Sequence, residues 1–403
     1  MRHSLAGRAE SPMQARILAR LRDDGPTSKV QLADRLAVSR TTIAVEVARL
    51  VELGLAQDAG PAASRGGRRS TMVDLAADIR FLGVAVGATG LSVGVTDGRL
   101  GLLAVRERAC DIRQGPEVVL ATALEVAREV LAEAGVDRPM GAGIAVPGPV
   151  DFHRGVPVSP PIMPGWDGYP VRDALSRELG CPVVLDNDVN VLAVGEQHAG
   201  VARSVDDFLY VKIGTGIGCG IVIDGELYRG VDGCAGDIGH IRVEEAGPLC
   251  ACGNTGCLEA FAGGAALGRE ANVLARSGRS PALAAILEQR GDGEPLTAAD
   301  VATAVAQGDP ESLRLMRESG RRVGQVLASL VSFFNPGLIV IGGRVTGLGH
   351  ALLAEIRAVT YRNSLPLATG SLPIVVSELG EEGGVIGAAR LISDSVYAVD
   401  EGS

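Results

Sequence analysis

One histidine and three cysteines lie within eighteen residues of one another in this chain. His240 is followed, after nine residues, by the run Cys250-Ala-Cys252-Gly-Asn-Thr-Gly-Cys257. Zinc takes four nitrogen or sulfur ligands in a tetrahedron, and glycines let a short loop fold around the ion. The spacing predicts a closed structural zinc site, although buried thiols without a metal are the alternative. The other cysteines are isolated and are expected to be small buried residues: Cys110, Cys181, Cys219 and Cys234.

Two carboxylates lie next to this motif. Asp237 precedes His240 by three residues, and Glu259 follows Cys257 by two. A folded metal loop would hold both side chains rigidly, and rigid carboxylates are suited to recognising the hydroxyl groups of a polyol. Both are therefore candidate ligand-binding residues.

A second polar group follows a predicted buried strand at residues 183–185. The run Asp186-Asn187-Asp188 lies at the end of this strand, where α/β folds display ligand-binding groups. A carboxylate there can accept a proton from a substrate hydroxyl or hydrogen-bond to it. Capping of the next helix by Asn187 or Asp188 is the alternative, and the tripeptide alone does not decide between them.

A glycine-rich turn joins two predicted strands at residues 208–213 and 219–223. Its sequence is Gly214-Thr215-Gly216-Ile217-Gly218. Such a turn can bring backbone N–H groups close to a phosphate. A glycine-rich hairpin without further context is weak evidence for that role.

Length and composition describe a folded protein of more than one domain. The chain has 403 residues, of which 46% are hydrophobic and 21% charged. Residues 1–10 lack the apolar core of a signal peptide, and apolar runs elsewhere are too short for a membrane helix. Seven cysteines, three of them in the metal motif, fit a reducing compartment better than a disulfide framework. We therefore expect a cytoplasmic protein.

Charge is unevenly distributed along the chain. Residues 1–75 carry 12 basic and 8 acidic side chains, whereas the remaining residues carry 26 and 40. A small basic part thus precedes a large acidic one. The basic part indicates a polyanionic partner, and the acidic part argues against nucleic acid lying across it.

The basic part has the pattern of a winged helix-turn-helix. Residues 11–23 begin with Ser-Pro-Met-Gln and a second Ser-x-x-Gln box starts at Ser28, so two helices are expected. The turn at residues 37–39 leads into a third helix with apolar residues at helical spacing. Residues 71–75 alternate as a strand after a glycine- and arginine-rich loop, which is typical of a wing.

DNA is the expected partner of this module. Side chains at the start of the third helix are suited to base edges and phosphates of a major groove: Ser39, Arg40, Thr41 and Thr42. Arginines of the wing tip could enter the minor groove or hold phosphates: Arg65, Arg68 and Arg69. A winged helix that contacts only protein is the alternative.

The acidic part alternates strands and helices. Strands are predicted at residues 81–86, 91–96, 141–146, 183–185, 208–213, 219–223 and 338–341, and helices at 117–134 and 383–392. A linker at residues 76–80 precedes them, a long loop runs from residue 147 through Trp166, and residues 265–334 are mostly helical. Strand hairpins followed by helices, repeated twice, indicate two α/β lobes.

Together these residues resemble the ROK family (repressors, open reading frames and kinases), whose members share an actin-like ATPase fold. The resemblance covers about residues 83–391, and with the winged helix the whole chain resembles a ROK transcriptional regulator. It implies domains at 1–77, 78–200 completed by 381–398, and 201–380. It implies zinc at His240, Cys250, Cys252 and Cys257, with sugar contacts at Asn187, Asp188, His240 and Glu259. Asp188 falls at the position of the kinase base, the Gly214–Gly218 turn at a phosphate site, and Gly342-Gly343 near the nucleotide.

The chain departs from the family pattern both at a phosphate-binding motif and at positions expected to recognise the sugar. The kinase motif Asp-x-Gly-Gly-Thr is replaced by Ala85-Val-Gly-Ala-Thr89, so a carboxylate that manages metal-bound phosphates is missing. Asp237 stands in place of glutamate, and Ile162 in place of the asparagine of many members. Since phosphoryl transfer depends on charges around Mg-ATP, loss of that carboxylate is expected to slow it by orders of magnitude.

The sequence thus predicts a sugar-responsive transcription factor without kinase activity, most simply a repressor of carbohydrate uptake or metabolism genes. A homodimer or homotetramer is expected. The first alternative is an active ATP-dependent sugar kinase that carries a regulatory winged helix. The second is a regulator that has lost its sugar site and senses a protein partner or nothing.

Overall fold

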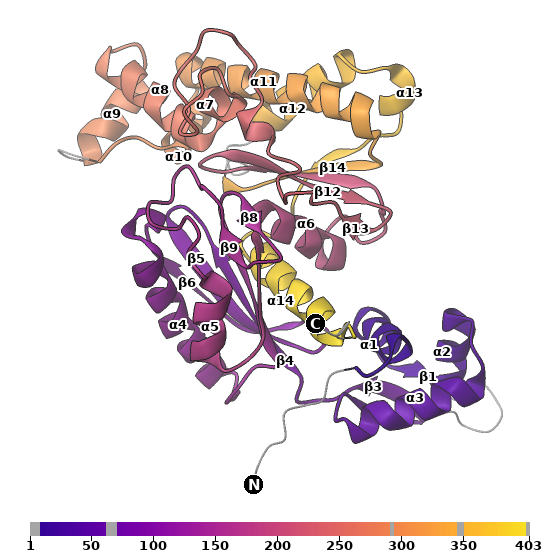
Figure 1. Cartoon of the computed structure of the whole chain (residues 1–403). Coiled ribbons are helices and arrows are strands. Elements are labelled where there is room, and N and C mark those ends of the chain that lie inside the picture. The colour runs from indigo at the N-terminus through magenta and orange to yellow at the C-terminus, as the bar shows by residue number, and fades with distance from the viewer. Residues whose placement is uncertain (1–8, 62–70, 291–293, 345–349, 400–403) are drawn as a thin grey trace. The chain divides into compact units, whose positions relative to one another are not determined.

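The computed structural model describes residues 9–61, 71–290, 294–344 and 350–399. The chain divides into two compact units, Met1–His198 with Glu381–Ser403, and Ala199–Gly380. The expected fold class, a winged helix-turn-helix ahead of a mixed α/β body, is confirmed (Figure 1). Within the described ranges, no helix combines the length and apolar character needed to cross a membrane.

The N-terminal module has three helices and a small antiparallel sheet of order β1-β3-β2. Both predicted serine caps form, because Ser11 accepts the Gln14 N–H and Ser28 accepts the Gln31 N–H. The Gln14 side chain accepts from Glu10 N–H, one residue before the position that a full capping box requires. The elements are α1 (Pro12–Asp24), β1 (Thr27–Ser28), α2 (Lys29–Leu36), α3 (Arg40–Glu52), β2 (Ala56–Pro61) and β3 (Thr71–Leu75).

The hydrophobic core of this module continues into the body of the first unit. Ile17, Leu21 and Ile43 are fully buried and belong to the same cluster as Phe81 and Tyr397. The rings of Phe81 and Tyr397 pack edge to face, with centroids 5.9 Å apart. The module is therefore packed on the body and not merely tethered by the predicted linker at residues 76–80.

The body of the first unit is a five-stranded sheet of order β10-β7-β4-β5-β6. The pairs β10/β7 and β7/β4 are parallel, and β4/β5 and β5/β6 are antiparallel. One face packs on α4 and α5, and the other face packs on α14 (Figure 1). The elements are β4 (Arg80–Val86), β5 (Gly90–Asp97), β6 (Leu102–Ala109), η1 (Ile112–Gln114), α4 (Pro116–Glu133), β7 (Gly141–Val146), β8 (Val150–Asp151), β9 (Val156–Pro157), α5 (Val171–Leu179), β10 (Val183–Asn187), α6 (Asp188–Ala199) and α14 (Glu382–Tyr397).

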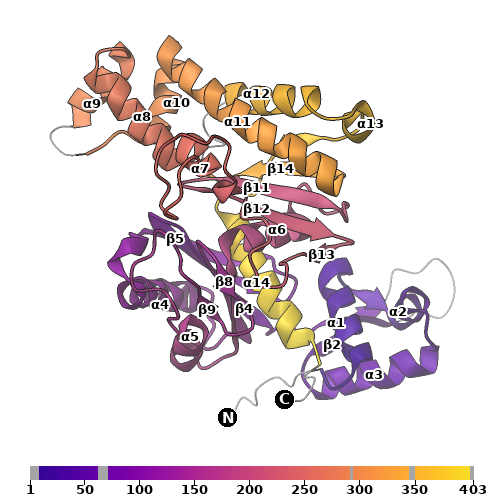
Figure 2. The ribbon, with the colours of Figure 1, turned by 45° about the horizontal axis from the view of Figure 1, so that its top comes forward.

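The second unit has a five-stranded sheet of order β13-β12-β11-β14-β15 and a layer of helices. Its core joins the sheet to α8, α10 and α11, and α11 and α12 lie side by side (Figure 2). The elements are β11 (Phe208–Ile213), β12 (Ile217–Ile223), β13 (Glu226–Leu227), η2 (Ile238–His240), α7 (Leu258–Ala262), α8 (Gly264–Arg276), α9 (Pro281–Arg290), α10 (Ala298–Ala306), α11 (Pro310–Phe334), β14 (Leu338–Gly342), α12 (His350–Arg362), α13 (Pro366–Thr369) and β15 (Ile374–Val376).

The structure differs from the sequence prediction in several places. The predicted long loop after residue 146 contains the short hairpin β8/β9, and Trp166 is fully buried, with its Nε1 donating to the Ile112 carbonyl. Strand β6 and helix α5 were not predicted. β6 is an edge strand with mostly exposed residues, so its apolar alternation is weak. Cys110, Cys181 and Cys219 are buried as expected, but Cys234 is exposed because it lies in the loop between β13 and η2.

Candidate functional site

The predicted metal ligands come together in the second unit. His240 ends the short helix η2, Cys250 and Cys252 lie in a turn, and Cys257 is the N-cap of α7. The turn is closed by hydrogen bonds from Cys250 N–H to the Asn254 carbonyl (2.8 Å) and from Gly253 N–H to the Cys250 carbonyl (3.0 Å). Gly253 has φ 90°, a backbone conformation that favours glycine.

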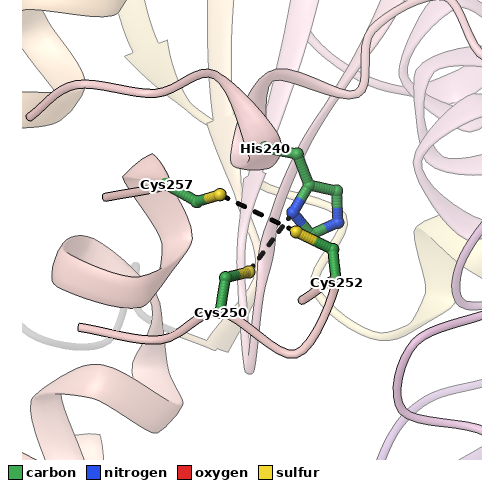
Figure 3. Close-up of side chains that lie close together, drawn as sticks. All are labelled: His240, Cys250, Cys252 and Cys257. Carbon is green, nitrogen blue, oxygen red and sulfur yellow. Dashed lines mark hydrogen bonds between the residues drawn. The ribbon is translucent and has the colours of Figure 1, made fainter. Parts of the chain in front are cut away.

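The four side chains point toward one another (Figure 3). Their ligand atoms all lie within 4.8 Å of one another. Cys250 Sγ is 3.4 Å from His240 Nδ1, and Cys252 Sγ is 3.8 Å from Cys257 Sγ. A tetrahedral zinc site with standard bond lengths places sulfurs about 3.8 Å apart and sulfur about 3.5 Å from nitrogen. The donor set and its spacing fit a metal ion of this kind.

Burial of these thiols disfavours their charged form. It raises the pKa of Cys250 and of Cys257 above the ordinary thiol value. A divalent cation would act in the opposite direction, because it stabilises the thiolates that bind it. Metal binding at this cluster would therefore release protons and weaken as the pH falls.

His240 has a second side that is turned away from the sulfur atoms. Its Nδ1 faces Cys250, whereas its Nε2 is 3.8 Å from Asp237 Oδ1. Burial raises the pKa of the Asp237 carboxyl, and the neighbouring Glu259 also raises it. The ring can thus offer Nδ1 to a metal and present Nε2, with Asp237, to a ligand.

Glu259 lies between the metal cluster and the glycine-rich turn. Its Oε1 is 3.3 Å from Cys250 Sγ, and a Cβ added at Gly216 would lie 2.5 Å from its Oε2. A side chain at position 216 would therefore displace the Glu259 carboxylate from this position. Of the predicted ligand residues, the structure brings Asp237, His240 and Glu259 together in the second unit.

The glycine-rich turn is fixed by the start of α8. Gly264 N–H donates to the Gly214 carbonyl (2.7 Å), and Ala265 N–H donates to the Thr215 carbonyl (3.1 Å). Across the turn, Gly214 N–H donates to the Gly216 carbonyl (2.9 Å), and Gly218 pairs with Lys212 in the β11/β12 hairpin. The carbonyl groups of Gly214, Thr215 and Gly216 thus already accept hydrogen bonds from within the unit.

An arginine on α11 supports the metal loop from outside. Arg322 stacks on the ring of Phe261, with its guanidinium carbon 3.9 Å from the ring centroid. Its Nη1 is 2.7 Å from Glu244 and its Nη2 is 2.8 Å from Glu318. Glu244 belongs to the loop between His240 and Cys250, and the Phe261 ring packs closely on Gly247 of the same loop. This role could not be predicted from the sequence, because the arginine is far from the loop along the chain.

Replacement of Arg322 by alanine is expected to weaken metal binding by about tenfold, the lower range for residues that support ligands. The reason is that the loop loses its attachment through Glu244 and Phe261. Zn²⁺ titration against a chelating dye measures the affinity. Arg314→Ala is the control, because Arg314 is exposed on the same helix and pairs with Glu311 at 3.0 Å, away from the metal loop. Equal affinities in the two variants would contradict this role.

The predicted polar group of the first unit lies where β10 meets α6. Asn187 accepts the Val189 N–H at 2.9 Å and donates to the Gly148 carbonyl at 2.7 Å. The structure therefore shows Asn187 as the cap of α6, which was the alternative to ligand binding. The same side chain also attaches α6 to the Pro147–Pro149 loop through the Gly148 carbonyl. Asp188 is the first residue of α6 and is buried. A ligand role for Asn187 and Asp188 remains a prediction.

The hairpin β4/β5 contains the substituted phosphate motif. Ala85 lies near the end of β4, and Gly87 N–H donates to the Gly90 carbonyl at 2.7 Å to close the turn. The methyl group of Ala85 faces the start of α14, where a Cβ added at Gly384 would lie 2.8 Å away. This position carries no charge that could bind a phosphate or its metal ion.

The predicted DNA-binding residues of α3 are exposed. Ser39 caps the helix by accepting the Thr42 N–H at 3.0 Å, and the Ser39 and Thr42 hydroxyls are 2.8 Å apart. Arg40 and Thr41 begin the helix on its exposed side. Val45, one turn further along, was not predicted from the sequence; it is 63% exposed and could contact a thymine methyl group. Arg65, Arg68 and Arg69 lie outside the described residues.

Both the N-terminal module and the body of the chain match known protein families. The model of the ROK family matches residues 81–395, and a model of winged helix-turn-helix DNA-binding domains matches residues 12–57. The chain is 28% identical over 385 residues to a putative xylose repressor of Caldicellulosiruptor sp. (strain Rt8B.4), covering 95% of each protein. It is 31% identical over 320 residues to a glucokinase of Thermotoga maritima, covering 79% of this chain and 98% of the glucokinase.

One solved structure has a similar fold over nearly the whole length of this chain. It is described as a ROK family transcriptional regulator, a homologue of the Escherichia coli MLC protein. It is 25% identical, covers 96% of each chain and has a TM-score of 0.81. The glucokinase, by contrast, leaves about a fifth of this chain unmatched. The chain therefore belongs to the ROK family, and a winged helix-turn-helix precedes its ROK domain.

Proposed function

We propose that the protein is a sugar-responsive DNA-binding transcriptional regulator, most simply a repressor of genes for carbohydrate uptake or metabolism. The observation that carries this proposal is the winged helix-turn-helix, whose recognition helix α3 presents exposed polar residues at its start. A relative that aligns with 95% of this chain, the winged helix-turn-helix included, is a putative xylose repressor. The acidic body supplies the ligand-binding part.

For the ligand site we propose Asp237, His240 and Glu259 of the second unit as sugar contacts. Asn187 and Asp188 of the first unit are the further sugar contacts that the family resemblance implies. The metal is zinc in this proposal, because one imidazole and three thiolates in a closed loop are its preferred structural ligands. The ion would fix His240 and Glu259 in place, since both belong to the metal loop.

Regulation requires that sugar and operator favour different states of the protein. In this proposal, sugar binding changes the placement of two winged helices in a homodimer and lowers operator affinity. A two-fold dimer would read an inverted repeat with half-sites about one helical turn, or a multiple of it, apart.

The test is a selection of genomic fragments by the purified protein, followed by release with single sugars. We expect enrichment of an inverted repeat near carbohydrate genes and release of that fragment by one sugar or a few. Fragments without a shared repeat would contradict the proposal.

The similarity to glucokinases makes kinase activity the second candidate function. We propose that it is absent, because Ala85 replaces the carboxylate that the kinase motif carries. ADP release should not exceed the sugar-free rate with hexoses, pentoses or amino sugars. Robust turnover with any of them would establish the kinase alternative.

A further inference from the structure

One helix of the first unit begins at a proposed ligand position, and a second begins beside the substituted phosphate motif. Helix α6 starts with Asp188, directly after Asn187. Helix α14 starts at Glu382, and its Gly384 packs against the Ala85 side chain of the substituted phosphate motif. A change at either position would therefore act on the first turn of a helix.

These two helices pack on each other and on the sheet through glycines. A Cβ at Gly195 would overlap the Gly383 carbonyl, and a Cβ at Gly387 would overlap the Val191 carbonyl. Toward the sheet, a Cβ at Gly143 would overlap the Ala388 carbonyl of α14. Backbone therefore packs directly on backbone. Close-packed contacts of this kind transmit a displacement because no flexible side chain lies between the elements.

The far ends of both helices meet α1 of the DNA-binding module. Arg22, on the last turn of α1, is 2% exposed. Its Nη1 donates to Ser393 Oγ and to Asp394 Oδ1, both at 2.6 Å, and its guanidinium carbon is 5.8 Å from the Tyr397 ring centroid. Three side chains of α14, a hydroxyl, a carboxylate and an aromatic ring, therefore fix the orientation of the Arg22 guanidinium.

A second set of contacts joins α6 to the same place. Asp23 of α1 is 3.1 Å from Arg390 of α14. His198, near the end of α6, accepts from Arg390 at its Nδ1 (3.2 Å), and its Nε2 is 3.3 Å from the Arg99 carbonyl. Burial, with the nearby Arg390 and Arg22, lowers the pKa of His198 to about 4, so the ring is neutral and suited to accept this hydrogen bond.

We propose that α6 and α14 form a rigid connector that carries the ligand-dependent change to the DNA-binding module through Arg22, Asp23, His198, Arg390 and Asp394. In this role Arg22 and Asp394 are positioning residues: they contact neither sugar nor DNA, but they set where the winged helix is held. The inference rests on the proposed function, because it needs a ligand and an operator to couple.

The experiment measures operator affinity of the full-length protein without sugar and with saturating D-glucose or D-xylose. The ratio of the two dissociation constants is the coupling, for which about 5- to 150-fold is typical. Asp394→Asn removes the charge that holds Arg22 from α14, and its side chain is 47% exposed, so the variant should fold. Its ratio is expected to fall below about twofold.

Asp24→Asn is the matched control. It makes the same change of carboxylate to amide one residue after Asp23, but Asp24 pairs with Arg20 and Arg35 inside the module. This variant should keep the wild-type ratio. A wild-type ratio in Asp394→Asn would overturn the connector.

A measurement on the unaltered protein gives a second, independent test. Sugar should change the rate of amide hydrogen exchange at residues 12–24 and 382–397 as well as at the ligand site. Changes confined to the ligand site would overturn the connector even if operator release is normal. Wild-type protein that binds no operator, or whose affinity no sugar alters, would instead show that the proposed function itself is wrong, and the connector with it.

Discussion

Cys257→Ser is expected to remove the bound metal and to lower the Tm of the second unit by about 8–16 °C. The estimate follows from mass action, because an ion present at about a thousand times its dissociation constant stabilises the folded state by about 4 kcal/mol. One kcal/mol corresponds to about 2–4 °C for a unit of this size. Cys257 is fully buried as the N-cap of α7, so its loss also leaves that end of the loop unattached.

Metal content and thermal unfolding, each with and without a strong chelator, measure the effect. The wild-type protein should carry one ion per chain and lose most of the difference in Tm when chelator is added. Cys234→Ser is the control for the chemical change itself, because Cys234 belongs to the same unit, is exposed and lies outside the cluster. It should keep both the metal and the wild-type Tm.

The same variant bears on ligand recognition. Because His240 and Glu259 are fixed by the metal loop, Cys257→Ser is expected to lose sugar response along with the ion. A Cys257→Ser protein that retained one ion per chain and a wild-type Tm would contradict the metal site. One that lost the ion but responded normally to sugar would contradict its structural role.

Local sequence patterns were sufficient for the metal cluster and for most of the fold. The ligands lie on one short segment, so their spacing and the glycines between them define the loop almost by themselves. Strands such as β7 (Gly141–Val146) are buried on both faces and read as continuous apolar runs, which made their bounds predictable.

Contacts between distant segments could not be predicted in this way. Arg22 resembles any polar residue on an amphipathic helix until α14, more than 350 residues later in the chain, brings Ser393 and Asp394 to it. Arg322 is hidden from sequence reasoning for the same reason. Asn187 could not be assigned for a different reason, because its sequence pattern fitted both a helix cap and a ligand contact. The hydrogen bond that it accepts from the Val189 N–H identified the cap.

Arg40→Ala is expected to weaken operator binding by about 10- to 100-fold, the equivalent of about 1–3 kcal/mol for a lost arginine contact. The Ser39 hydroxyl caps α3 by accepting the Thr42 N–H. It also forms a hydrogen bond with the Thr42 hydroxyl, with the two oxygens 2.8 Å apart. Arg40 is therefore the longest exposed side chain at the start of the helix with reach into a groove. Because it is exposed, thermal stability should be unchanged.

The salt dependence of binding separates the two contacts that Arg40 could make. Loss of a phosphate contact lowers the slope of log K against log salt by about one, whereas loss of a base contact relaxes specificity at one position of the operator. Arg49→Ala is the matched control on the same helix, since Arg49 pairs with Glu10 at 2.9 Å and Glu52 at 3.0 Å. It should change affinity by less than about threefold, because a guanidinium already held by two carboxylates contributes little to a phosphate. If Arg40→Ala bound the operator like wild type at every salt concentration, α3 would not enter the groove by its N-terminal end.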